Sequence, residues 1–150
     1  MKPKHKFEET NHGLVILYTG EGKGKTTAAL GLALRAAGYK RKVLIIQFGK
    51  IWFTGELEGV KKLTPYVKLI QSGKWEVVIA DELVGSVHAK MITQKQVLDL
   101  IKARPKLLDF VLTGHHAKPA LIKASDLATE MMPIKHPFEK GFLAKPGIDY

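Results

Sequence analysis

The stretch Thr19-Gly-Glu-Gly-Lys-Gly-Lys-Thr-Thr27 decides the fold, because it places three glycines and two lysines directly before a helix-forming segment. Residues 13–19 form a short run of β-branched, leucine and aromatic side chains, which is typical of a strand buried on both faces. Residues 26–37 are rich in alanine and leucine and predict a buried helix that ends at Gly38. Residues 43–48 predict a second buried strand. This order of strand, glycine loop, helix and strand predicts a βαβ unit.

A glycine loop in this position is suited to bind phosphate groups. Glycines let successive backbone N–H groups point inward as an anion nest, and the following helix adds its positive N-terminal end. Lys25 can then contact phosphate oxygens, and the Thr26 hydroxyl can ligate Mg²⁺. The residues expected to bind nucleotide here are Gly20, Glu21, Gly22, Lys23, Gly24, Lys25, Thr26 and Thr27. A plain glycine-lysine turn between a strand and a helix is the less favoured alternative.

The loop departs from the strict P-loop pattern at one position. That pattern requires glycine at position 19, where this chain has threonine. We expect Gly20 and Gly22 to supply the flexibility instead. The motif is therefore a variant P-loop.

Two carboxylates at the end of a later strand supply the second half of a metal-nucleotide site. Residues 76–80 predict a strand whose four apolar residues, 77–80, are followed by Asp81 and Glu82, and a P-loop needs such an acidic group to hold its metal. We expect Thr26, Asp81 and Glu82 to surround one Mg²⁺ that bridges the nucleotide phosphates. Lys25, Thr26 and Glu82 are the expected catalytic residues. Taken alone, the acidic pair also fits a helix N-cap followed by an exposed glutamate.

The rest of the chain continues the alternation of strands and helices. Thr93 and Gln96 form a capping box that predicts a helix ending before Arg104. The other elements expected are helices at 56–63 and 119–124 and strands at 67–70, 107–113 and 127–131. Alternation over the whole length predicts one α/β domain across residues 1–150, with a parallel sheet covered on both faces. Residues 1–12 form a polar N-terminal arm and residues 133–150 a C-terminal tail.

Composition narrows the class of protein. The chain has 150 residues, of which 45% are apolar and 25% charged, as in a soluble globular domain. It has no cysteine, which excludes disulfides, thiolate metal sites and cysteine nucleophiles. Its apolar runs are far shorter than the ~20 residues of a membrane span, and residues 7–12 are too polar for a signal peptide, so we expect a cytoplasmic protein. The net charge of +10 suits a polyanionic partner or a solvated lysine-rich surface.

The motifs together resemble those of the P-loop type of ATP:corrinoid adenosyltransferases, which act on cob(I)alamin or cob(I)yrinic acid a,c-diamide. The resemblance extends over residues 13–150. It rests on residues 19–29, 43–48, 54–56, 78–83, 103–105, 112–114, 133–138 and 147–150. It implies a three-layer, RecA-like fold with a mainly parallel sheet, a homodimer, Mg·ATP as co-substrate, and a role in cobalamin biosynthesis or salvage.

The resemblance also implies a reaction. Co(I) of the reduced corrinoid attacks the ribose C5′ of ATP, accepts the 5′-deoxyadenosyl group and displaces triphosphate. The protein then needs no nucleophile of its own, but must position the substrates and stabilise the departing triphosphate. The glycine loop, Lys23, Lys25 and the metal suit that role. A reductase that converts Co(II) to Co(I) is an expected partner.

The corrinoid side departs from the family pattern. Only residues 71–74 lie between the segments 65–70 and 75–79, where the family carries an aromatic loop and a helix that closes over the corrinoid. Trp52 and Phe53 are the remaining aromatic candidates for corrinoid contact, or they are packing residues. His115 follows Thr-Gly where the family tends to have arginine, so a titratable group replaces a fixed charge. We expect His115 to contact the nucleotide; the alternative is that His115 and His116 are exposed loop residues.

Two rival functions stay open on the sequence alone. One is a small P-loop NTPase in which Glu82 activates water, and the other is a nucleotide- or corrinoid-binding protein that has lost its lid. Nucleic acid is not an expected partner, because no RNA-binding signature accompanies the basic charge. Product analysis separates the three functions, because only a transferase forms triphosphate and a Co–C bond.

Overall fold

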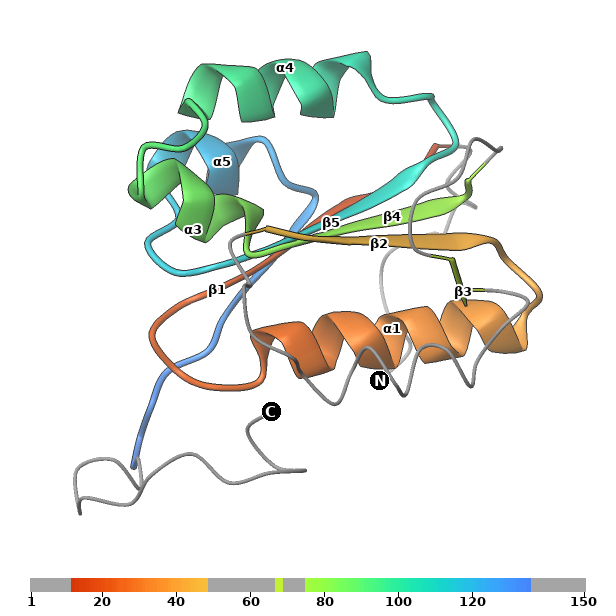
Figure 1. Ribbon diagram of the computed structural model, residues 1–150, viewed down its shortest axis with the longest axis horizontal. Helices are drawn as coiled ribbons and strands as arrows, with labels where there is room; N and C mark the ends of the chain where they lie inside the picture. The colour runs from red at the N-terminus through yellow and green to blue at the C-terminus, as the bar shows by residue number, and fades with distance from the viewer. Residues whose placement is uncertain (1–11, 49–66, 69–74, 136–150) are drawn as a thin grey trace, which may run out of the picture.

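The computed structural model describes residues 12–48, 67–68 and 75–135. These residues form a sheet with helices on both faces (Figure 1). The strands are β1 (Val15–Thr19), β2 (Val43–Gln47), β3 (Val67–Lys68), β4 (Val77–Asp81), β5 (Asp109–Thr113) and β6 (Leu127–Glu130). The helices are α1 (Lys25–Gly38), α3 (Leu83–His88), α4 (Gln94–Ala103) and α5 (Pro119–Lys123).

The sheet has the order β3-β2-β4-β5-β1-β6, and every pair of neighbours is parallel. Helix α1 covers one face, and α3, α4 and α5 lie on the other (Figure 1). Right-handed crossovers explain this division, because the chain moves toward β3 when it passes through α1 and toward β6 when it passes through the other three helices. The predicted α/β fold with a parallel sheet is confirmed.

Alternating residues of the strands build two cores, one on each face. On β4, Ile79 packs with Ala29 and Ala33 of α1, whereas Ala80 faces the opposite core with Val97 and Ile101 of α4. The buried face of α1 is lined by small alanines, and the prediction of a buried helix is confirmed. The sheet is therefore buried on both faces in its central strands, which fixes the positions of the strand ends.

Most predicted elements occur within one to three residues of their expected bounds. The capping box is confirmed: Gln96 N donates to Thr93 Oγ1 at 3.2 Å, and Thr93 N donates to Gln96 Oε1 at 2.9 Å. The expected strand at 107–113 begins only at Asp109, because Leu108 N closes a turn by donating to Pro105 O at 3.0 Å.

Helix α3 was not predicted, since six residues are too few to show a helical period. The predicted helix at 56–63, Trp52, Phe53 and most of the predicted arm and tail lie outside the described residues. None of the helices in the described part of the chain is long and apolar enough to span a bilayer.

Candidate active site

The glycine loop lies between β1 and α1, as the sequence predicts. Gly20 and Gly24 have φ of 101° and 104°, a left-handed region that favours glycine. Gly24 is the N-cap residue of α1, and no side chain among the described residues caps that helix end. The first N–H groups of an uncapped helix lack intrahelical partners and attract an anion.

The end of β6 packs directly against this loop. Met131 N donates to Thr19 O at 2.7 Å, and Gly22 N donates to Met131 O at 2.6 Å. A Cβ on Gly20 would lie 2.5 Å from that same carbonyl oxygen. Glycine is therefore required at position 20 by close packing as well as by the backbone angle.

Lys25 lies inside the loop and is only 5% exposed. Its Nζ donates to Gly20 O at 2.7 Å and to Gly22 O at 2.8 Å. Burial lowers the pKa of Lys25 below its ordinary value, although the carboxylates of Glu82, Glu21 and Asp81 act in the opposite direction. The ammonium group is thus held at the centre of the loop by carbonyl oxygens that phosphate oxygens could replace.

Asp81 is the last residue of β4, and its carboxylate bonds residues of β2, β5 and α1. It is almost fully buried. Its Oδ1 accepts hydrogen bonds from Thr26 Oγ1 at 2.9 Å and Thr113 Oγ1 at 2.7 Å, and its Oδ2 accepts one from Gln47 Nε2 at 3.2 Å. The structure therefore brings Thr26 and Asp81 together, as expected. Gln47 and Thr113 are not among the site residues predicted from the sequence. The available signal was their position at the carboxyl ends of strands that flank β4.

Glu82 marks a sharp change of direction between β4 and α3. Its φ of 62° is unusual for a residue other than glycine, and its backbone N donates to Thr113 Oγ1 at 2.9 Å. It occupies the N-cap position of α3, but its side chain makes no capping hydrogen bond to the described helix. This differs from the helix-cap alternative, in which the first acidic residue caps the helix and the glutamate is exposed, because Asp81 belongs to the buried end of β4 and Glu82 occupies the N-cap position.

The oxygen atoms at this edge of the sheet suit a hard cation. No group of three or more histidine, aspartate or glutamate side chains in the described residues is arranged to hold a metal ion. A P-loop site differs from such a cage, since one hydroxyl, one or two carboxylates and the phosphates of the nucleotide share the ion. Thr26 and Asp81 provide that kind of donor set, and Glu82 follows directly in the chain.

Histidines of the β5–α5 loop contact the glycine loop through Glu21. His115 Nδ1 lies 3.4 Å from Glu21 Oε2, and His116 Nδ1 lies 3.2 Å from Glu21 Oε1. The ring of His88 stacks on that of His116 with a centroid distance of 4.3 Å. All three histidines border a cavity of about 390 Å³ that Glu82 also lines, which we call the active-site cavity. The predicted site residue His115 is therefore a neighbour of the loop.

Sequence similarity to known proteins identifies the family of this chain. The sequence model of ATP:corrinoid adenosyltransferase BtuR/CobO/CobP matches residues 11–73 and 61–150, which together cover most of the chain. The chain belongs to the ATP:corrinoid adenosyltransferase family. It is an enzyme of that family, and the glycine loop and the acidic end of β4 described above belong to it.

Three corrinoid adenosyltransferases illustrate the similarity. The Escherichia coli (strain K12) enzyme is 30% identical over 172 residues, which cover 95% of this chain and 88% of that protein. Corrinoid adenosyltransferase CobA of Salmonella typhimurium (strain LT2) is 29% identical with the same coverage. The enzyme of Sinorhizobium sp. is 30% identical, covering 92% of this chain and 80% of its own.

The alignment with the E. coli adenosyltransferase also reveals a difference in length. It spans 172 positions, but 95% of 150 residues is only about 142, so about 30 positions have no counterpart in this chain. The family model likewise matches in two pieces that meet within residues 61–73. This stretch overlaps residues 71–74, where the resemblance to the family implies a shortened connection.

Proposed function

We propose that this chain transfers the 5′-deoxyadenosyl group of Mg·ATP to the reduced cobalt of a corrinoid and releases triphosphate, in cobalamin biosynthesis or salvage. The observation that carries the proposal is the meeting of Lys25, Thr26 and Asp81 at the glycine loop in a member of this enzyme family. Hydrolysis of ATP alone is not favoured, because the similar curated proteins are named as adenosyltransferases.

The glycine loop and Lys25 are proposed to bind the triphosphate. Lys25 Nζ now bonds two carbonyl oxygens of the loop, and phosphate oxygens arriving there are stronger partners for an ammonium group than neutral carbonyls. The uncapped N-terminus of α1 adds N–H donors to the same anion. The full set proposed to bind nucleotide is Gly20, Glu21, Gly22, Lys23, Gly24, Lys25, Thr26, Thr27 and His115.

Mg²⁺ fits the oxygen donors of Thr26 and Asp81, with Glu82 as the third proposed metal residue. Bound there, the ion would supply positive charge against the growing negative charge of the triphosphate. The role of Gln47 and Thr113 is to hold the Asp81 carboxylate in place, since both donate to it. We propose that Lys25, Thr26 and Glu82 are the residues on which turnover depends most.

The bond changes need no nucleophilic side chain. The Co(I) electron pair forms the new bond to C5′ while the C5′–O bond breaks and its electron pair leaves with triphosphate. The protein contributes by holding the triphosphate in line and by stabilising its charge. Trp52 and Phe53 are proposed for the corrinoid side, and a homodimer and a reductase for Co(II) are proposed partners.

Product analysis tests the proposal. The protein is incubated with ATP, Mg²⁺ and a chemically reduced corrinoid, and nucleotides and corrinoids are separated by chromatography. We expect equal amounts of triphosphate and adenosylated corrinoid, and no ADP. Formation of ADP and phosphate that does not depend on corrinoid would contradict the proposal and identify an NTPase.

A further inference from the structure

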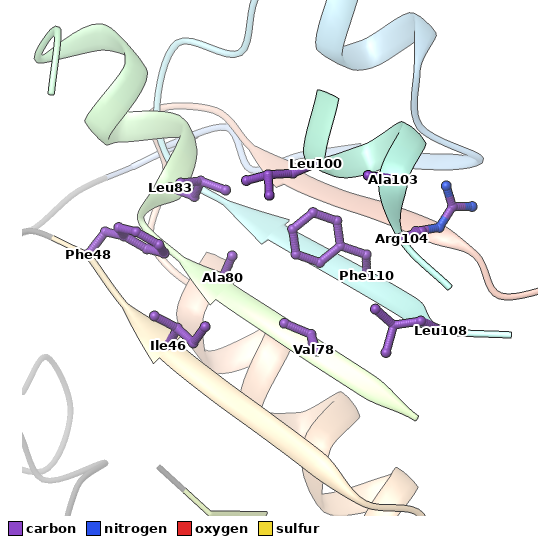
Figure 2. A pocket seen from close by; sticks show the side chains of 10 residues that line it. All are labelled: Ile46, Phe48, Val78, Ala80, Leu83, Leu100, Ala103, Arg104, Leu108 and Phe110. Atoms are coloured by element: carbon purple, nitrogen blue, oxygen red, sulfur yellow. The ribbon is translucent and has the colours of Figure 1, made fainter. Parts of the chain in front are cut away.

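An apolar groove lies on the α4 side of the sheet, and none of the phosphate-binding residues lines it (Figure 2). It has a volume of about 280 Å³ between α4 and the strands β2, β4 and β5. Nine of its ten lining residues are apolar, among them Ile46, Phe48, Val78, Leu100, Leu108 and Phe110. We call this space the α4 groove.

The one polar lining residue does not make the α4 groove polar. Arg104 Nη1 donates to Ile101 O at 2.7 Å, and Arg104 Nη2 donates to Gly13 O at 3.1 Å. These bonds anchor the guanidinium at the end of α4, beside Leu108 and away from Phe48 (Figure 2). A ligand in the groove would therefore meet an almost wholly apolar surface.

Chain topology explains why the groove is open. A right-handed crossover from β3 to β4 moves toward β6, as the crossover from β4 to β5 does, so it would cover the face that carries α4. A parallel crossover that includes a helix needs a dozen or more residues, but only eight lie between Lys68 and Val77. The E. coli relative has about 30 more aligned positions than this chain. We attribute the uncovered surface at Ile46 and Val78 to this shortening.

The α4 groove lies next to the active-site cavity. Phe48 lines both spaces, and Leu83 of the groove follows Glu82 of the active-site cavity in sequence. Phe48 and Leu83 lie together at one end of the groove, where β2 and β4 finish (Figure 2). A substrate bound in the active-site cavity would therefore lie beside this apolar surface at Phe48.

We infer that the α4 groove binds the aromatic base that a complete corrinoid carries on its nucleotide tail; this inference rests on the proposed function. A volume of about 280 Å³ lies at the lower end of small-molecule pockets, so it suits a fused two-ring base and not a whole corrinoid. The base is the apolar, flat part of the tail, and burial between Phe48, Phe110 and aliphatic side chains favours it. The polar ribose and phosphate of the tail would stay toward solvent.

A comparison of two substrates tests the inference. Steady-state turnover is measured with chemically reduced cobalamin, which carries a dimethylbenzimidazole base, and with reduced cobinamide, which lacks the nucleotide tail. We expect KM for cobinamide to be about tenfold higher, with kcat nearly the same, because a base held in the groove contributes equally to binding of the substrate and of the transition state. Equal KM values would overturn the inference and leave the adenosyltransferase proposal intact. Absence of corrinoid turnover with both substrates would instead contradict the proposed function.

Two exposed leucines give a matched pair of variants. Leu100 lines the groove and is 50% exposed, so Leu100→Glu should fold and place a charge where the base binds. We expect its KM ratio between cobinamide and cobalamin to fall from about ten toward one. Leu107 is 70% exposed and does not line the groove, and Leu107→Glu should keep the native ratio. A tenfold ratio that survives Leu100→Glu would place the base elsewhere and overturn the inference.

Discussion

The hydroxyl of Thr26 donates a hydrogen bond of 2.9 Å to Asp81 Oδ1, which joins the first turn of α1 to the last residue of β4. The two residues are 55 positions apart in sequence. The same carboxylate oxygen accepts a bond from Thr113 at 2.7 Å, so Asp81 remains anchored when Thr26 is changed. A substitution at Thr26 can therefore test metal binding while the bond between Thr113 and Asp81 still supports the fold.

Replacing Thr26 should weaken the binding of Mg·ATP more than it weakens the fold. In Thr26→Ala we expect affinity for Mg·ATP to fall at least about tenfold, because an oxygen ligand is lost and Asp81 loses one donor. Thr26→Ser keeps the hydroxyl and should retain most of the affinity. Isothermal titration calorimetry with and without Mg²⁺ measures the effect. Equal affinity in the native protein and Thr26→Ala would refute the metal assignment of Thr26.

Glu82 should show opposite effects on stability and activity. A residue other than glycine at φ 62° carries strain, so Glu82→Gly is expected to raise the free energy of unfolding by up to about 1 kcal/mol. The same change removes a proposed metal ligand and should lower turnover at least about tenfold. Glu82→Gln keeps the size of the side chain and should lower turnover without the gain in stability. Denaturant unfolding and single-turnover assays measure both quantities, and full activity in both variants would exclude a catalytic Glu82.

ATP affinity should depend on pH through Lys25. Burial lowers the pKa of this ammonium below 10.5, so it loses its proton, and with it its attraction for phosphate, at a lower pH than an exposed lysine. We expect ATP affinity to begin falling at alkaline pH below 10.5, and Lys25→Arg to flatten that fall. Fluorescence titrations with a nucleotide analogue across this range provide the measurement. An identical alkaline slope in both proteins would mean that another group controls it.

The lowered pKa of Lys25 also predicts the direction in which the stability of the fold changes with pH. Between the lowered folded-state pKa and 10.5, the unfolded chain binds more protons than the folded chain. The contribution of Lys25 to stability therefore increases as the pH rises through that window. Comparison of the native protein with Lys25→Met by urea unfolding at several pH values isolates this contribution.

Two glycines should respond in opposite directions to alanine. Gly20 has φ 101°, and a Cβ there would meet Met131 O at 2.5 Å, so Gly20→Ala should cost about 2 kcal/mol or more of stability. Gly31 lies within α1 and has open space around a Cβ, so Gly31→Ala should stabilise the protein by about 0.5–1 kcal/mol. Thermal unfolding in the absence of nucleotide is the measurement. A Gly20→Ala protein as stable as the native one would contradict the close packing of β6 on the loop.

The charge at position 115 should affect the affinity of the glycine loop for ATP. His115→Arg places a fixed cation beside Glu21 and the nucleotide site, and we expect ATP to bind roughly threefold more tightly at pH 8. His115→Gln, which has no positive charge, should bind ATP no better than the native protein. Equal affinities in the two variants would show that His115 is an exposed loop residue without a role in nucleotide binding.

The order of the central elements follows directly from the sequence. The glycine loop, the alanine-rich helix after it and the apolar runs of β1, β2 and β4 have strong local patterns, and each was located within about three residues. Helix α3 has no such pattern, because it is only six residues long and starts from a residue with positive φ. Short elements of this kind depend on packing against the sheet rather than on local preference.

The sequence by itself determined the loop, the lysine, the threonine and the acidic strand end, since these belong to short motifs whose chemistry depends on spacing. Only the tertiary structure decided that Gln47 and Thr113 hold Asp81, because the adjacency of β2, β4 and β5 is set by long-range strand pairing. The same pairing decided that a shortened connection leaves an apolar groove beside Phe48. Sequence spacing reveals a missing segment, but the surface it would cover depends on the crossover rule and on the order of strands in the folded sheet.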